Sequence, residues 1–275
     1  MRETRAPRAS ELDEGVGQAR RDAGRGHRRR LLIIENRLLL ALPDADRRAV
    51  MANAELVEIP VGSILQETLS APAFAYFPED GLGSVVAVME DGSMVEAASV
   101  GRDGFVGASL YLGAARSTAR VIWQVPGEAY RIPAEAFLDL IAEGRFGDSL
   151  AGYLQQMQDQ MTQVAGCNRR HTIERRAARW LLMTHDRVSG DQFLLTHEFL
   201  ATMLGAGRPK VTIAAQKLQQ AGLISYRRGV VSIRDRAGLE RAACECYRVI
   251  ASMFPGEKRK APELRGGMSE AASSA

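Results

Sequence analysis

The sequence predicts an α+β protein in which a strand-rich half is followed by a helical half. Between about residues 56 and 132, short apolar or β-branched runs alternate with turn residues, as in a compact antiparallel sandwich or roll. From about residue 133 the apolar residues recur with helical spacing. The charge also changes sign between the halves. At 275 residues the chain is long enough for about two domains.

Composition excludes several classes of protein. The chain is 46% hydrophobic and 25% charged, which is typical of a globular protein and not of a disordered or collagen-like one. It contains no apolar stretch long enough to predict a membrane span, and its N-terminal region has no signal-peptide core. Three cysteines cannot form a disulfide framework, so we expect a reducing, cytoplasmic location.

The charge distribution suggests a polyanionic partner. Residues 31–166 carry 8 Lys and Arg against 18 Asp and Glu, whereas residues 167–254 carry 15 against 7. A folded basic segment favours nucleic acid as the partner. The alternative is a solvated surface that happens to be basic.

The first half is predicted to begin with a flexible tail over residues 1–30, followed by helical sequence in which Asp44 caps a short helix that runs through Arg47 to Ala54. Seven strands follow. They are predicted at Leu56–Ile59, Ser63–Glu67, Ala73–Phe77, Ser84–Met89, Met94–Val100, Ala119–Gln124 and Glu128–Ile132. A helix is predicted at Ala134–Ala142.

A longer helix is predicted over residues 148–171. An apolar heptad seam along it comprises Leu150, Leu154, Met157, Met161 and Val164. Polar residues flank this narrow seam, which is typical of a helix that packs against a second copy of itself in a parallel dimer. Asn168, at the next a position, would fix the register. The alternative is that the seam packs on the protein's own sheet.

The next helices resemble a DNA-reading unit. Thr172 is predicted to cap a helix at Ile173–Arg187. Two short helices, Leu195–Leu204 with Thr196 as its cap and Arg208–Gln220, are joined by a turn containing glycine, which is the helix-turn-helix signature.

A hairpin of Leu223–Tyr226 and Val230–Ile233 follows, with Arg227 and Arg228 near its tip as a wing against phosphates. Asp235–Phe254 is predicted to be helical again.

The order of roll, long helix and winged helix-turn-helix resembles the Crp/Fnr family of bacterial transcription regulators over about residues 35–250. The segment LTHEFLATMLGAGRPKVTIAAQKLQQAGLISYRRGVVSI is similar to the DNA-binding motif of that family along its full length. The resemblance implies that Arg208, Pro209 and Ile213 read bases and that Thr196 and Lys210 contact phosphates. The complete candidate DNA-binding set is Thr196, Arg208, Pro209, Lys210, Thr212, Ile213, Gln216, Arg227 and Arg228.

Two departures from the family pattern affect the expected operator. An acidic residue is common in the family where Pro209 stands, and an arginine is common where Ile213 stands. We therefore expect an operator that differs from the best-known one of the family.

The resemblance also implies an effector pocket in the roll. In relatives that bind cyclic nucleotides, the cassette reads Gly-Glu and then Arg-Ser or Arg-Thr. Here Gly107 is followed by Ala108, and Arg116-Ser117 come eight residues later. The candidate pocket residues are Gly107, Arg116 and Ser117. Ala108 cannot accept a hydrogen bond from a ribose hydroxyl, so we do not expect cyclic nucleotide binding. The cofactor is unknown, and the absence of cysteine before Cys167 argues against the iron–sulfur branch of the family.

We expect neither a catalytic nor a metal site. Cys244-x-Cys246 does not have the spacing of a zinc knuckle, so buried thiols are expected, and the four histidines lack metalloprotease spacing. His171 is expected in a core or hinge role. The hydrolase-like run Gly147–Leu150 is a coincidence, because no histidine has the aspartate three residues before it that such enzymes carry.

These observations predict a division of the chain into five parts. They are a tail over residues 1–30, a β-roll sensor domain over residues 31–147, a dimerisation helix over residues 148–171, a winged helix-turn-helix domain over residues 172–254 and a tail over residues 255–275. The expected function is that of a homodimeric, sequence-specific transcription regulator and not an enzyme. The expected partners are a pseudo-palindromic duplex and a second copy of the chain, with RNA polymerase as a further candidate and no membrane. The alternative is a small-molecule-binding signalling module whose basic domain contacts protein.

Overall fold

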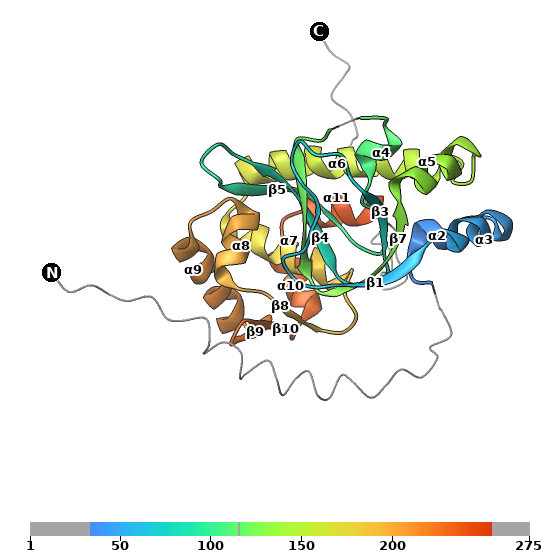
Figure 1. Ribbon diagram of the computed structural model, residues 1–275. Helices are drawn as coiled ribbons and strands as arrows, with labels where there is room; N and C mark the ends of the chain where they lie inside the picture. The colour runs from blue at the N-terminus through green and yellow to red at the C-terminus, as the bar shows by residue number, and fades with distance from the viewer. Residues whose placement is uncertain (1–33, 115, 255–275) are drawn as a thin grey trace, which may run out of the picture. The chain divides into compact units, whose positions relative to one another are not determined.

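The computed structural model describes residues 34–114 and 116–254 (Figure 1). The two predicted flexible tails, residues 1–30 and 255–275, lie outside these ranges. The α+β class predicted from the sequence is confirmed.

The first half is a roll of two antiparallel sheets. Its strands are β1 (Glu55–Ile59), β2 (Ile64–Gln66), β3 (Phe74–Pro78), β4 (Leu82–Val88), β5 (Met94–Val100), β6 (Ala119–Val125) and β7 (Gly127–Pro133). The sheet orders are β1-β7-β3 and β2-β6-β4-β5. All seven predicted strands are therefore present, and β5 has the predicted bounds.

Two groups of apolar side chains form the core of this half. Trp123, fully buried, packs with Ile59 and Ala129. Five aromatic rings form a second group, in which the centroids of neighbouring rings lie 5.3–6.2 Å apart. These rings belong to Phe77, Phe105, Phe137, Phe146 and Tyr153. The last comes from the long helix, so the same core holds that helix against the roll.

The helices of the first half are α2 (Arg37–Leu40), α3 (Asp44–Ala52), α4 (Ala108–Tyr111) and α5 (Ala134–Ala142). The last has the predicted bounds. In α3, Asp44 is the first helical residue and Pro43 occupies the cap position, so Asp44 does not cap the helix as predicted. Helix α4 was not predicted, because a single turn of four residues is too short to show apolar periodicity.

The long helix α6 (Ser149–Arg170) packs on β5 and on α11 (Cys246–Met253) (Figure 1). Three of the predicted seam residues, Leu150, Met157 and Val164, are buried within the chain itself. The other two, Leu154 and Met161, are half-buried. The fully buried Gln160 links α6 to the sheet: its amide donates to the carbonyl of Ser99 at 3.2 Å.

The second half contains the predicted helix pair and hairpin. Its elements are α7 (Ile173–His185), β8 (Gln192–Leu194), α8 (His197–Leu204), α9 (Arg208–Gln220), β9 (Ile224–Arg227), β10 (Val230–Ile233), α10 (Arg236–Ala242) and α11. Strand β8 was not predicted; it pairs with β10 and extends the hairpin to a sheet of order β8-β10-β9. The single helix expected at Asp235–Phe254 is two helices, because the chain is extended at Ala243.

Helix α8 packs against β5, so the pair of short helices contacts the sheet β2-β6-β4-β5. Strand β5 also meets α7, where the indole nitrogen of Trp180 lies 3.1 and 3.2 Å from the two carboxylate oxygens of Glu96. Both side chains are buried. The hydroxyl of Ser84 also donates to this carboxylate. A buried carboxyl group thus joins strand β5 to α7, the helix on which α8 and α9 pack.

Burial raises the pKa of the Glu96 carboxyl above its usual value, against the opposing effects of the Ser84 hydroxyl, the Trp180 N–H and the charges of Arg179 and Arg187. The folded state therefore holds this proton more tightly than the unfolded state does. The resulting stabilisation is complete below the unfolded pKa of about 4.5 and is lost as the pH rises through the folded value.

We accordingly expect Glu96→Gln, which cannot titrate, to gain stability relative to the parent protein as the pH rises from about 5 to about 8. Urea unfolding at several pH values measures the difference in the free energy of unfolding. The exposed Glu90→Gln is the control for removing a carboxylate. A difference between Glu96→Gln and the parent that stays constant across this range would contradict the prediction.

Candidate nucleic-acid interface

Helix α8 begins at a side-chain cap. The hydroxyl of Thr196 accepts a hydrogen bond from the backbone N–H of Phe199 at 3.1 Å, as the capping prediction required. The helix ends at Gly205, whose φ of 55° is left-handed and suits glycine. A Cβ there would also lie 3.2 Å from Val95 of β5, so the turn between the two helices lies close to this strand.

Helix α9 has a buried face and an exposed face. Val211, Ala214, Ala215 and Leu218 are buried against the helices α7 and α8, as predicted. The opposite face carries most of the candidate base-reading and phosphate-contacting residues. Arg208, Pro209, Lys210, Ile213 and Gln216 are exposed on it, and Thr212 is half-buried. Ile213 is 53% exposed, which is unusual for a residue of this type and leaves its side chain free to contact an apolar group.

The first turn of α9 presents two cations, Arg208 and Lys210. The guanidinium of Arg208 lies 3.4 Å from Glu198, but both side chains are more than 60% exposed. Such an exposed ion pair contributes little to stability. Arg208 can therefore exchange this carboxylate for a base edge at small cost.

A cluster of His197, Thr212 and Tyr226 ties the hairpin to the helix pair. The rings of His197 and Tyr226 stack with centroids 4.3 Å apart, and the hydroxyl of Tyr226 donates to the carbonyl of Leu195 at 2.8 Å. Burial, together with the charge of Arg208, lowers the pKa of His197. Its ring is therefore neutral near pH 7, and one nitrogen pairs with the Thr212 hydroxyl at 3.1 Å. Sequence reasoning missed this cluster because its members are separated along the chain.

The hairpin exposes Arg227 and Arg228 at its tip. Arg228 has a φ of 49° and Gly229 a φ of 77°, which is the geometry of a tight turn that matches the twist of its strands. These two arginines are thus exposed, as are Thr196 and Lys210, so a phosphate can approach all four residues.

The candidate effector residues occupy a different part of the chain, in the roll. Gly107 is buried, has a φ of 137° and precedes α4. A Cβ at this position would lie 3.2 Å from Ala75. Arg116 is exposed, and the hydroxyl of the half-buried Ser117 accepts from the backbone N–H of Ala119 at 3.1 Å. Ala108 opens α4, so no carboxylate stands at the position where the family cassette has glutamate.

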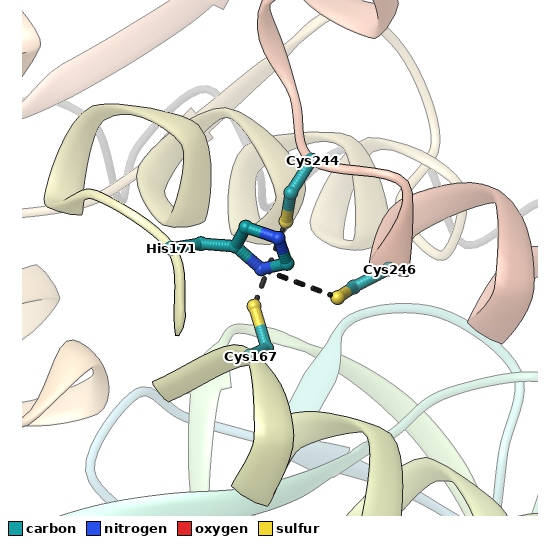
Figure 2. A group of neighbouring side chains, drawn as sticks. All are labelled: Cys167, His171, Cys244 and Cys246. Atoms are coloured by element: carbon teal, nitrogen blue, oxygen red, sulfur yellow. Dashed lines mark hydrogen bonds between the residues drawn. The ribbon is translucent and has the colours of Figure 1, made fainter. Parts of the chain in front are cut away.

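Figure 2 shows a cluster of Cys167, His171, Cys244 and Cys246. Their ligand-type atoms all lie within 4.8 Å of one another. A hydrogen bond from the Cys244 thiol and the charge of Arg179 lower the pKa of Cys167, whereas burial raises the pKa of Cys246. Along the chain the four residues form two separate local pairs, Cys167 with His171 and Cys244 with Cys246, and no local signal indicates that the two pairs meet.

Two protein-family models match the chain, one in its strand-rich half and one in its helical half. Residues 56–143 match the model of a cyclic nucleotide-binding domain, and residues 175–242 match that of a Crp-like helix-turn-helix domain. No curated protein sequence matches the chain. In the part of the chain that the structure describes, every helix is too short or too polar to cross a membrane.

Solved structures of similar fold cover most of the chain. FixK2 from Bradyrhizobium japonicum is 12% identical with a TM-score of 0.57, covering 70% of this chain and 98% of its own. A CRP-family transcriptional regulator from Thermus thermophilus is 22% identical with a TM-score of 0.56, covering 68% and 96%. The c-di-GMP-responsive regulator CLP from Xanthomonas campestris is 18% identical with a TM-score of 0.54, covering 70% and 99%.

Proposed function

Because this chain belongs to the Crp/Fnr family of DNA-binding transcription regulators, we propose that two copies of it form a dimer that binds a pseudo-palindromic operator under the control of a signal at the β-roll. It is a non-enzymatic regulator with an effector-sensing domain. The observation that carries the proposal is the exposed face of α9, with Arg208 and Lys210 in its first turn.

The exposed face supports specific roles for its side chains. The N-terminal end of a recognition helix enters the major groove, where arginine can donate a bidentate pair to guanine and an aliphatic side chain can contact a thymine methyl. Arg208, Pro209 and Ile213 would read bases, with Thr212 and Gln216 alongside. Thr196, Lys210 and the wing residues Arg227 and Arg228 would contact phosphates. In a dimer, the two recognition helices would lie about 34 Å apart to reach successive major grooves.

The dimer would form along the open side of α6. Leu154 and Met161 are only half-buried by their own chain, and Ala151, Gln155 and Gln158 next to them are exposed. A second copy would cover this side. Leu150, Met157 and Val164 would then support the interface from within each chain. Continuity between the sensor sheet and α6 through Gln160 supports a route from the roll to the interface.

The control step would be a shift between two arrangements of the helix-turn-helix relative to the roll. Its supports are the packing of α8 on β5 and the pairing of Glu96 with Trp180. The pocket around Gly107, Arg116 and Ser117 would take the signal. Since Ala108 replaces the ribose-binding carboxylate, the expected effector is not a cyclic nucleotide. A cytoplasmic location and contact with RNA polymerase complete the proposal.

Leu154→Glu is expected to break the dimer, because it places a charge in the centre of the proposed apolar interface. The dimer Kd should rise at least about 30-fold, as for the loss of a hot spot of about 2 kcal/mol. Sedimentation equilibrium measures this, and operator affinity should fall with it. Leu138→Glu, at an exposed leucine of α5, is the matched control and should leave the dimer intact. Equal association of the parent and both variants would show that α6 is not the interface.

The function itself is tested by selecting genomic DNA fragments on the purified protein and sequencing them. A dyad-symmetric motif supports the proposal. Binding without sequence preference would instead favour a signalling module whose basic domain contacts another protein.

A further inference from the structure

Cys167, His171, Cys244 and Cys246 converge from three different elements. Cys167 lies in the last turn of α6, and His171 is the residue at which that helix ends. Cys244 lies between α10 and α11, and Cys246 is the first residue of α11. All three cysteines are buried and unoxidised, and their side chains point toward the imidazole (Figure 2). We propose that these four residues form a tetrahedral Zn²⁺ site that fastens the end of the long helix to the C-terminal helices.

The spacing of the donor atoms fits one metal ion. With zinc–sulfur bonds of about 2.3 Å and zinc–nitrogen bonds of about 2.0–2.1 Å, the ligand atoms of a tetrahedral site lie about 3.5–3.8 Å apart. The sulfurs of Cys167 and Cys244 are 3.5 Å apart, and the sulfur of Cys246 is 3.5 Å from Nδ1 of His171. An iron–sulfur cluster spreads its thiolates over several irons and sets them farther apart. Three thiolates and one imidazole are a donor set that zinc prefers.

The surroundings of His171 support the same conclusion. Its Nε2 pairs with the carboxylate of Glu245 at 3.0 Å. The carboxylate can only accept, so Nε2 carries a hydrogen, and in the neutral ring Nδ1 is then the nitrogen whose lone pair faces the sulfurs. A carboxylate behind a ligating histidine is the usual arrangement in metal sites, where it holds the ring and the tautomer. The amide of Gln163 similarly donates to the sulfur of Cys246 at 3.0 Å.

Charge provides a separate argument. Zinc with three thiolates and a neutral imidazole carries a net charge of −1. Arg176 and Arg179 are 6% and 2% exposed, and charge interactions link both to the cysteines. Among the described residues, the Nε of each arginine has no hydrogen-bond partner. Buried guanidinium groups need compensating anions. Glu96 already interacts with Arg179, and the metal–thiolate centre would supply a further anion to both arginines.

The site would fasten together segments that serve different parts of the proposed function. Helix α6 carries the proposed dimer surface, and α10 and α11 pack on α7, which supports the helix-turn-helix. A metal that bridges Cys167 and His171 to Cys244 and Cys246 would fix the angle at which the DNA-binding segment leaves the long helix. The cysteines are buried, as the sequence predicts, and the proposal adds a metal ion that they would share with His171.

The test uses the full chain purified under reducing conditions, with metal content measured by mass spectrometry. We expect about one zinc per chain. After zinc removal, Co²⁺ should bind with thiolate charge-transfer bands and the visible bands of tetrahedral cobalt. Cys246→Ser and His171→Ala should lose zinc, and Glu245→Gln should weaken zinc binding by about 10–100-fold in competition with a chromophoric chelator.

The control is His197→Gln. It removes a histidine that is not one of the four proposed zinc ligands, so it should keep the full zinc content. If the cysteine and histidine variants fail to fold, the zinc content and cobalt spectrum of the parent protein still decide. Metal-free protein that gives no such spectrum would overturn the proposal. Iron with labile sulfide would also overturn it, as would zinc retained equally by the parent, Cys246→Ser and His171→Ala.

Discussion

Arg208→Ala is expected to weaken binding to the cognate operator by about 1–3 kcal/mol, or roughly 5- to 150-fold in Kd, and to relax specificity at one base pair in each half-site. The physical reason is the position of its guanidinium at the exposed first turn of α9, where its ion-pair partner is the exposed Glu198. The loss of a bidentate contact to a base edge affects the cognate sequence more than any other. Titration of labelled duplexes, each with one base pair changed, measures both effects.

Two comparisons make this prediction specific. Lys210→Ala removes a proposed phosphate contact, so it should weaken binding about equally on all sequences and reduce the salt dependence. Arg48→Ala removes an exposed arginine from α3 and should leave DNA binding unchanged. If Arg208→Ala weakens binding equally on every duplex, the residue contacts phosphate and does not read a base.

Trp180→Ala is expected to lower the free energy of unfolding by about 3–5 kcal/mol and the Tm by on the order of 10 °C. The indole is 2% exposed and packs edge-on against Phe199 with centroids 6.2 Å apart. Its removal leaves a cavity beneath α8 and takes a hydrogen-bond donor from the buried Glu96 carboxylate. Urea denaturation and calorimetry measure the loss.

The variant Trp180→Phe separates the two causes. It keeps most of the apolar volume but has no N–H, so it should show the smaller loss of about 1–3 kcal/mol expected for an unpaired buried acceptor. In Glu96→Gln protein the cost of Trp180→Phe should change, because the two side chains are in contact. Independent, additive effects of the two substitutions would mean that the pair does not couple the sensor sheet to α7.

Local signals in the sequence were sufficient for the regular elements. The alternation of apolar residues and turns located all seven strands of the roll, and the bounds of β5 and α5 were correct to the residue. Glycine at a left-handed position after α8 and threonine at its cap specified the turn between the two short helices. Such signals act within a few residues, so a single chain is enough to read them.

The errors have local and tertiary causes. Asp44 lies within α3 because its neighbour Pro43 takes the cap position, which is a local shift of one residue. Strand β8 is too short to show a pattern and exists because β10 offers it a partner. The continuous helical pattern after Asp235 is broken at Ala243, which brings Cys244 toward Cys167.

By itself, the sequence determined most of the strands and helices, the two faces of α9 and the change from an acidic to a basic half that suggests a nucleic-acid partner. These properties depend on neighbours along the chain. Only the tertiary structure decided which sides of α6 are covered, that Glu96 pairs with Trp180, and that Cys167 and His171 meet two cysteines more than 70 residues away. Contacts between distant residues depend on how the elements pack, and packing is a property of the whole folded chain.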